Sequence, residues 1–189
     1  MTQPPPELWL ARHGETDWTL SRQHTGLTDL PLTAHGEEQA RELAGRLAGT
    51  DFAVVWSSPL RRALDTAHLA GFAQPRIDDR LVELDYGEYE GVTTADIRRD
   101  RPDWDLWTDG CPGGESVDDV GARMDSLIAD LRRGAGPIVA FAHGHALRIL
   151  AARWLGLPAR EGRALLLAPA GIGVLGSEHG HPAVARWNP

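Results

Sequence analysis

The sequence predicts an α/β fold with a mostly parallel central sheet and helices on both faces. Three short apolar runs bounded by loops indicate buried strands, at residues 8–11, 53–56 and 138–142. Helical patterns separate these runs, and strands that alternate with helices are typical of a parallel sheet covered on both faces. The chain has 189 residues, of which 42% are hydrophobic, so we expect one domain that spans residues 1–189.

Capping residues and apolar spacing place the helices. Thr33 can cap a helix whose apolar side chains continue to Leu47. Ser58 and Pro59 mark a second helix start, because proline at the first helical position lacks only an amide hydrogen that would have no partner there. "SVDD" at 116–119 has capping-box spacing and opens a third helix.

The last third of the chain completes the expected sheet. A fourth helix is predicted over about 145–155, and two strands follow it, "ALLLA" at 164–168 and "IGVLG" at 172–176. The glycine-rich, tryptophan-bearing stretch 99–115 is expected to be an irregular excursion.

Composition excludes several classes of partner. A formal net charge of -8 and a pI of about 5.4 provide no basic surface for nucleic acid or an anionic membrane, so we expect a small ligand. Cys111 is the only cysteine, which excludes an intrachain disulfide and a four-cysteine zinc site. The sequence shows neither a basic segment followed by an apolar one, as in a leader, nor a long apolar run, as in a membrane span. We therefore expect a cytoplasmic location.

Polar side chains follow each apolar run, where ligands bind in open α/β sheets. Arg12 and His13 follow the first run, and Glu83 follows a short apolar pair. The residues after the other two runs are Ser57, Ser58, Arg61 and Arg62, and His143, Gly144 and His145. Two histidines, arginines and a carboxylate can therefore meet at one edge of the sheet.

Such a set of side chains suits phosphoryl transfer without a metal. The transition state spreads negative charge over three oxygens, which arginine forks and the first turn of a helix can stabilise. A neutral imidazole can attack phosphorus, and a carboxylic acid can protonate the leaving oxygen and then activate water.

Four motifs in order resemble the histidine phosphatase superfamily, which has the phosphoglycerate-mutase-like fold: "RHGET", "SSPLRRALDTA", "ELDYGEYEG" and "FAHGHALR". The resemblance covers residues 8 to about 176. It implies that His13 is the phosphorylated nucleophile and that Glu83 is the proton donor. It also implies that Arg12, Arg62 and His143 complete the phosphate pocket, whereas Arg61 has no matching role and is expected at the surface.

Further segments are similar to one branch, the sedoheptulose-1,7-bisphosphatases and broad-specificity acid phosphatases. This resemblance implies a phosphatase for sugar phosphates or bisphosphates, with no cofactor. Substrate contacts are expected, by the same resemblance, from Ser58, Arg148, Thr19, Thr25, Gly26 and Tyr86. Members of the family are often dimers, which leaves a homodimer open.

Cofactor-dependent phosphoglycerate mutases are the alternative within the superfamily. They resemble this chain in "HTG" and "ELDYG", but they carry an asparagine where this chain has Thr19 and a basic insertion with paired arginines that is absent here. Without those groups a phosphoglycerate would be held poorly for re-phosphorylation, and water would react instead.

Other interpretations stay open at this stage. His143 and His145, or His179 and His181, could bind a metal, although the latter pair is expected at the surface. Asp85, Glu88 and Glu90 compete with Glu83 as the acid. Trp104 and Trp107 could line the pocket mouth or pack in the core. A binding module without catalysis is also conceivable. Activity should be higher below neutral pH, because His143 is expected to act as a cation and the acid must start protonated.

Overall fold

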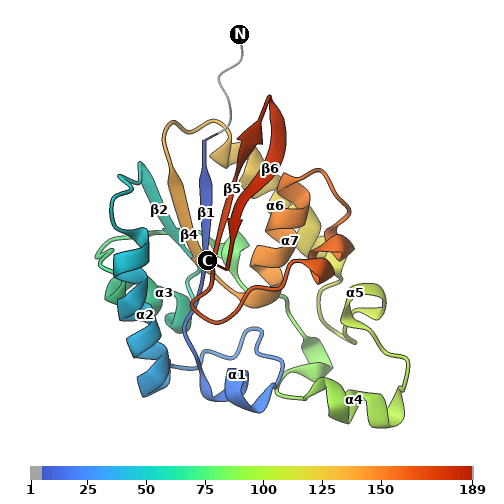
Figure 1. Cartoon of the computed structure of the whole chain (residues 1–189). Coiled ribbons are helices and arrows are strands. Elements are labelled where there is room, and N and C mark those ends of the chain that lie inside the picture. Colours follow the sequence, from blue (N-terminus) through green and yellow to red (C-terminus); the bar gives the residue numbers. More distant parts are fainter. Residues whose placement is uncertain (1–5, 189) are drawn as a thin grey trace.

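The computed structural model describes residues 6–188, which form a twisted six-stranded sheet flanked by helices (Figure 1). The strand order is β3-β2-β4-β1-β5-β6. Residues 1–5 and Pro189 lie outside the described residues. Both ends of the domain expected over 1–189, and the start of the segment inspected for a leader pattern, therefore fall there.

The parallel part of the sheet contains the three strands predicted from apolar runs. They are β1 (Leu8–Arg12), β2 (Val54–Ser57) and β4 (Ile138–Ala142), and the short β3 (Arg76–Ile77) extends this part beyond β2. On the other side, β5 (Ile172–Glu178) pairs antiparallel with β1, and β6 (His181–Trp187) pairs antiparallel with β5. The mostly parallel sheet is therefore confirmed.

Helices cover both faces of the sheet, as predicted (Figure 1). Helices α2 (Ala34–Leu47) and α3 (Arg61–Leu69) cover one face, and α6 (Val117–Leu131) and α7 (Gly144–Trp154) cover the other. Alternate residues of β1 point to the two faces, because side chains alternate along a strand. Leu8 and Leu10 pack with the α6 and α7 side, whereas Trp9 and Ala11 pack with the α2 and α3 side.

Two of the predicted helix starts have the expected caps. The Thr33 hydroxyl accepts a hydrogen bond from the Gly36 amide at the start of α2. Ser116 and Asp119 form the reciprocal capping box of α6. Helix α3 begins two residues after Pro59, at Arg61, and its amide donates to Asp29 Oδ1 at 2.7 Å, so a residue from a distant loop caps it.

Two predictions for the chain's last quarter and its central excursion were wrong. Residues 164–168 form no strand: a 3₁₀ helix ends at Ala164, and the Leu166 and Leu167 carbonyls accept from side chains rather than from a strand. Strand β6 was not predicted, because its exposed sequence has no apolar alternation. The 99–115 stretch includes the end of α4 (Thr94–Asp100) and the short α5 (Leu106–Asp109).

Register brings the carboxyl ends of the parallel strands together. Arg12 pairs with Ala142, and the next amide along, that of His13, donates to the Ala142 carbonyl at 3.0 Å. The Ser58 amide donates in the same way to the Phe141 carbonyl at 2.9 Å. The short helix α1 (Asp17–Ser21) then lies across this edge (Figure 1). Within the part of the chain that the structure describes, no helix is both long and apolar enough to cross a membrane.

Candidate active site

His13 lies directly after β1 and is 3% exposed. Its Nδ1 is 2.7 Å from the Gly14 carbonyl oxygen. Because a carbonyl can only accept, Nδ1 carries the proton and Nε2 keeps its lone pair. Burial, together with the positive charges of Arg12 and Arg62, holds the pKa of His13 well below the usual 6.5, so the imidazole is neutral and nucleophilic.

Gly14 fixes this arrangement by its lack of a side chain. A Cβ at this position would lie 2.3 Å from the Gly36 carbonyl oxygen at the start of α2. The Gly14 amide donates to the Thr66 hydroxyl of α3 at 3.1 Å. The glycine after His13 is therefore required for the close approach of β1's end to both helices.

Arg62 is fully buried in the first turn of α3, as its position after a strand predicted. Its Nη atoms donate to the carbonyls of Thr25, Gly26 and Thr28, which surround the guanidinium. Its Nε donates to His143 Nδ1 at 3.1 Å. These contacts hold the guanidinium in one orientation beside His143.

His143 is neutral in this structure, which corrects the expectation that it acts as a cation. Its Nδ1 accepts from Arg62, so its proton lies on Nε2, which is 2.8 Å from the Ser58 hydroxyl. Burial lowers its pKa well below 6.5, and the charge of Arg62 lowers it further. The His13 and His143 ring centroids lie 5.2 Å apart.

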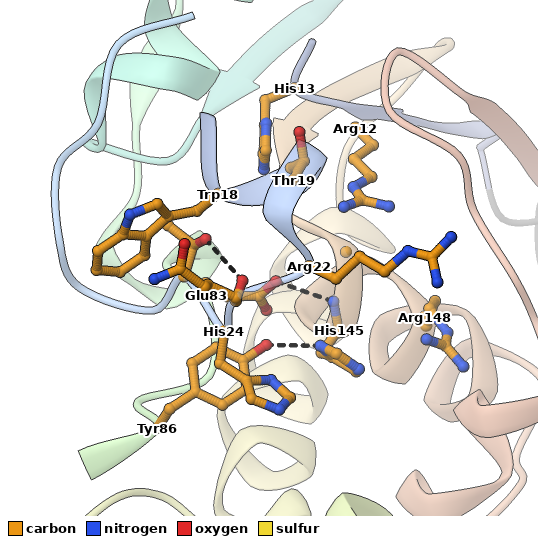
Figure 2. A pocket seen from close by; sticks show the side chains of 13 residues that line it. Arg12, His13, Trp18, Thr19, Arg22, His24, Glu83, Tyr86, His145 and Arg148 are labelled. Atoms are coloured by element: carbon orange, nitrogen blue, oxygen red, sulfur yellow. Dashed lines mark hydrogen bonds between the residues drawn. The ribbon is translucent and has the colours of Figure 1, made fainter. Parts of the chain in front are cut away.

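Arg12 points into the cavity between His13 and Arg148 (Figure 2). Its Nη1 donates to the Leu167 carbonyl at 2.7 Å, which anchors one end of the guanidinium. Its Nε is buried and has no hydrogen-bond partner among the described residues. An unpartnered buried donor of this kind is costly unless a ligand accepts from it, and the anion of a phosphoryl group would do so.

Glu83 lies at the amino end of α7, as Figure 2 shows. Its Oε1 accepts from the Leu84 and Ala146 amides, and its Oε2 accepts from the His145 amide at 3.0 Å. The helix end therefore positions the carboxylate. Asp85, Glu88 and Glu90 do not line the cavity, so Glu83 is the only carboxylate among the described residues that borders it.

These side chains border a cavity of about 260 Å³ at the edge of the sheet. The predicted residues Arg12, His13, Glu83, Thr19, Thr25, Tyr86 and Arg148 line it. Arg62, His143, Ser58 and Gly26 are buried and do not line it. Ser58 instead contacts His143, and Gly26 contacts Arg62 through its carbonyl, so both are placed to support the pocket.

The other side chains predicted to contact substrate differ in how many of their polar atoms already have hydrogen-bond partners. The Thr19 hydroxyl is bound to the Thr16 backbone in the capping box of α1, and the Thr25 hydroxyl donates to the Gln23 carbonyl. Tyr86 Oη lies 2.6 Å from His145 Nδ1. Arg148 keeps its Nη1 without a hydrogen-bond partner among the described residues, because only its Nε and Nη2 donate to carbonyls.

Five cavity-lining side chains were not predicted as site residues: Trp18, Arg22, Gln23, His24 and His145. The first four belong to α1 and the turn after it, a region in which the sequence offers no strand-end signal. His145 was named among the residues that follow the third apolar run and as a possible metal ligand, but it was given no role in the site. No group of three metal-ligating side chains occurs among the described residues.

The tryptophans and the remaining candidate residues lie in different parts of the molecule: the core, the wall of the site and the surface. Trp104 is a core residue, 2% exposed, which leaves pocket lining to other side chains. Trp107 packs against His145 and under the Arg148 guanidinium, 4.6 Å from its ring centre. Arg61 pairs with Asp65 at the surface, as expected, and His179 and His181 are exposed.

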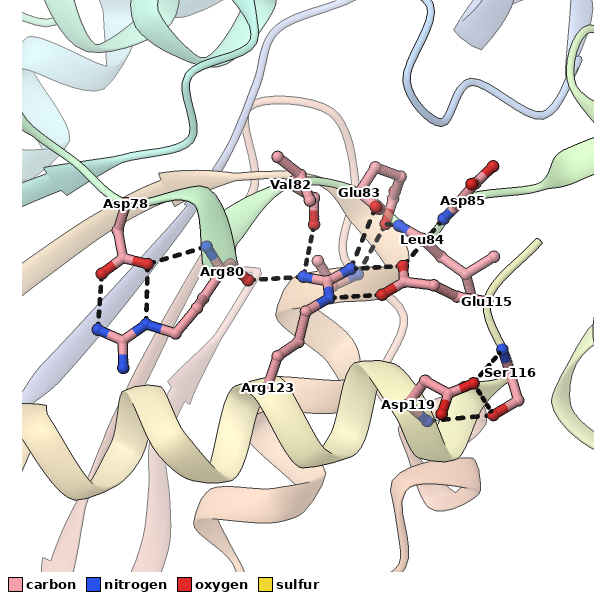
Figure 3. A network of polar contacts seen from close by, with 11 residues as sticks. Asp78, Arg80, Val82, Glu83, Leu84, Asp85, Glu115, Ser116, Asp119 and Arg123 are labelled. Atoms are coloured by element: carbon pink, nitrogen blue, oxygen red, sulfur yellow. Dashed lines mark hydrogen bonds and ion pairs between the residues drawn. The ribbon is translucent and has the colours of Figure 1, made fainter.

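Arg123 of α6 supports the segment that carries Glu83, and sequence reasoning missed it (Figure 3). Its Nη1 donates to the Arg80 and Val82 carbonyls, and its Nη2 donates to the Glu83 carbonyl at 3.1 Å. Its Nε and Nη2 also pair with the Glu115 carboxylate. One guanidinium therefore holds three backbone carbonyls within residues 80–83, the segment that carries Glu83.

Comparison with known proteins places this geometry in a family. Residues 8–189 match the histidine phosphatase superfamily (branch 1). The chain belongs to the histidine phosphatase superfamily. The branch expected from the sequence is also represented, because this histidine phosphatase is 48% identical to an acid phosphatase of Mycobacterium tuberculosis over 92% of this chain and 87% of that protein.

Two further relatives support the same assignment. A sedoheptulose 1,7-bisphosphatase of Saccharomyces cerevisiae is 36% identical over 80% of this chain and 68% of that protein. A solved mycobacterial glucosyl-3-phosphoglycerate phosphatase superposes with a TM-score of 0.86 at 33% identity, over 97% of this chain and 98% of that one. The fold of this histidine phosphatase is thus shared along its length with enzymes named for phosphatase activity.

Proposed function

We propose that this chain is a phosphatase that hydrolyses small phosphorylated metabolites through a phosphohistidine at His13. The observation that carries the proposal is the free lone pair on His13 Nε2. The hydrogen bond to the Gly14 carbonyl keeps the proton on Nδ1, so Nε2 is unprotonated in the cavity that Arg12 also lines. A nucleophile, fixed cations and a carboxyl group in one cavity are the components that phosphoryl transfer needs.

In the first step, His13 Nε2 attacks the phosphorus and the bond from phosphorus to the leaving oxygen breaks. Glu83, protonated at Oε2, gives its proton to that oxygen, so an alcohol leaves. The Oε2 atom accepts a single hydrogen bond and has room for the proton. Arg12 and Arg62 stabilise the charge on the transferred group, and the Nδ1 hydrogen bond to Gly14 supports the positive phosphoimidazole.

In the second step, the Glu83 carboxylate takes a proton from water. The water oxygen attacks phosphorus, the bond to His13 breaks, and inorganic phosphate leaves with Glu83 protonated again. The two steps sum to hydrolysis of a phosphomonoester. His143 stays neutral and holds the Arg62 guanidinium in place, because Arg62 and Ser58 occupy its ring nitrogens in this structure.

Sugar phosphates are the proposed substrate class. Relatives named acid phosphatase, sedoheptulose 1,7-bisphosphatase and glucosyl-3-phosphoglycerate phosphatase support it. The mutase alternative is less favoured, because Thr19 stands in place of the mutase asparagine and its hydroxyl is bound to Thr16. A cytoplasmic enzyme that needs no metal and binds neither nucleic acid nor membrane is part of the proposal.

His13→Ala tests the nucleophile. We expect release of phosphate from sugar phosphates and from p-nitrophenyl phosphate to fall by at least about 10³-fold, since the variant lacks the imidazole that forms the proposed intermediate. Acid quenching after incubation with a ³²P-labelled substrate should leave label on the wild-type chain and none on the variant. The control is His181→Ala, an exposed histidine. Near-normal turnover by His13→Ala would refute the proposed nucleophile. Loss of wild-type activity in EDTA would refute the proposal that the enzyme needs no metal.

Glu83→Gln tests the acid. A poor leaving group needs the proton and an aryl leaving group needs it little, so kcat for a sugar phosphate should fall about 10²-fold or more while kcat for p-nitrophenyl phosphate falls much less. Comparison of the two kcat ratios decides the point. Equal losses on both substrates would remove Glu83 from the role of proton donor.

A further inference from the structure

The cavity holds more cationic than acidic side chains, although the whole chain is acidic. Arg12, Arg22 and Arg148 line it against the single carboxylate of Glu83, and Arg62 lies buried beneath. The formal net charge of the chain is -8. This local excess of positive charge indicates a ligand with more anionic charge than one phosphoryl group carries.

Two of these arginines belong to the reacting phosphoryl group. Arg12 lines the cavity beside His13, and Arg62 donates to His143 behind it. Arg22 and Arg148 have no such contact with either histidine of the phosphate pocket. Their charges are therefore available for another part of the substrate.

Arg148 is a fixed cation on one wall of the cavity. Its Nε donates to the Gly162 carbonyl at 3.0 Å, its Nη2 donates to the Arg163 carbonyl at 2.8 Å, and Trp107 packs against the plane. Its Nη1 has no hydrogen-bond partner among the described residues. A guanidinium held in this way loses little further side-chain freedom when it binds an anion.

Arg22 is a free cation that comes from another wall. It is the residue that ends α1, with a φ of 62° that turns the chain away from the helix and leaves the side chain at the cavity. Its guanidinium makes no hydrogen bond or ion pair within the described residues. Figure 2 shows it between the guanidinium groups of Arg12 and Arg148, on the side of the cavity away from Tyr86.

We propose that Arg22 and Arg148 form a second anion subsite, which binds an acidic group of the substrate other than the phosphoryl group that reacts at His13. The inference rests on the proposed phosphatase function and narrows its substrates to metabolites with two acidic groups. A second phosphate or a carboxylate fits, since an arginine fork binds either one with two parallel hydrogen bonds.

The test uses matched substrate pairs that differ in the second acidic group. Fructose 1,6-bisphosphate is compared with fructose 1-phosphate and fructose 6-phosphate, and 3-phosphoglycerate is compared with glycerol 3-phosphate. For the wild type we expect kcat/KM to be about tenfold or more higher for the two-acid member of at least one pair. Preference in the first pair identifies a phosphate as the second group, and preference in the second pair identifies a carboxylate.

Arg22→Gln should remove most of that preference. We expect its kcat/KM for the preferred two-acid substrate to fall about tenfold, with a several-fold smaller loss on the one-acid partner, mainly through KM. Arg22→Lys keeps the charge without the fork and should retain part of the preference. The control Arg41→Gln removes one exposed arginine of α2 and should leave the preference unchanged.

Two results would contradict the proposal of a second anion subsite. One is a wild type that hydrolyses both members of each pair equally well, and the other is an Arg22→Gln variant that loses the same factor on both. Both results differ from failure of the proposed function, in which the wild type would release no phosphate from any of these substrates or from p-nitrophenyl phosphate.

Discussion

The hydrogen bonds of His143 determine what this residue can do. A histidine whose Nδ1 accepts from a guanidinium and whose Nε2 donates to a serine is neutral and fixed in orientation. A charged His143 is therefore no reason to expect higher activity below neutral pH. The Arg62 guanidinium, which can only donate, selects this tautomer, and the Ser58 hydroxyl accepts the hydrogen bond from Nε2.

Ser58→Ala should lower kcat for sugar phosphates about five- to tenfold, because the Nε2 hydrogen of His143 loses its acceptor and the ring loses its fixed orientation. A double-mutant cycle with His143→Ala separates positioning from direct contact with substrate. If Ser58 acts through His143, the double variant is no slower than His143→Ala alone.

The control for this cycle is Ser57→Ala, which removes a buried hydroxyl that donates to the Ser58 carbonyl. It should change stability without coupling to His143→Ala. Losses of Ser58→Ala and His143→Ala that multiply in the double variant would instead support the direct phosphate contact that the family resemblance implied.

The sequence predicted which residues lie at the site better than it predicted which of their polar atoms are free to bind a ligand. Arg12, His13 and Glu83 could be found because each follows an apolar segment, and the structure brings them to one cavity. That Ser58 lies behind His143 could not be found, since it depends on the relative height of β2 and β4. Arg22 was missed because a lone arginine in a turn is ordinarily a solvated surface residue.

At the level of elements, the site depends on four chain segments that end at one edge of the sheet. The ends of β1, β2 and β4 were predicted from short apolar runs, and α7 was predicted over about 145–155. The error at residues 164–168 arose because a run of leucines resembles a strand, whereas its carbonyls bind the Arg12, Trp187 and Asn188 side chains. Such tertiary contacts leave no periodic pattern in the sequence.

Arg123 connects α6 to the segment that holds Glu83, and its substitution tests that connection. Arg123→Met should lower kcat for sugar phosphates about three- to tenfold with little change in KM, because the Glu83 backbone loses its donor. The loss for p-nitrophenyl phosphate should be smaller, as expected of an effect that acts through the proton donor. Unfolding in urea should show a stability loss of about 2 kcal/mol, since a partly buried ion pair and three carbonyls lose their partner.

A matched control separates this effect from general loss of stability. Arg153→Met breaks a comparable ion pair between α7 and Asp125 of α6, away from Glu83. It should be destabilising without any dependence on the leaving group. Arg123→Lys should recover part of the rate. An Arg123→Met variant that slows both substrates equally would show that Arg123 supports only the fold.

Considered as a whole, the molecule buries several imidazoles in the same region as its arginines. Burial lowers the pKa values of His13, His143 and His145 well below 6.5, and that of His24 is lowered as well. In the unfolded chain these groups regain ordinary pKa values. Between the two sets of values, the unfolded state binds more protons than the folded state, so acid favours unfolding.

The free energy of unfolding should therefore be greatest above about pH 6.5 and should fall as pH drops from 7 to 5. Each such histidine contributes up to about 1.4 kcal/mol per pH unit in that window. Carboxylates with lowered pKa values, Asp78, Asp119 and Asp130, act only near and below 3.8, so they do not account for a loss at pH 5 to 6.5. Urea unfolding at pH 7, 6 and 5 measures the slope.

His145→Gln should make the slope shallower, because it removes one buried imidazole, and His181→Gln, which removes an exposed one, should leave it unchanged. Inorganic phosphate should stabilise the folded state by binding beside Arg12 and Arg62, with the size of the effect set by its concentration relative to its Kd. A stability that stays flat or rises between pH 7 and 5 would mean that these histidines are protonated in the folded state, and the neutral nucleophile at His13 would then have to be abandoned.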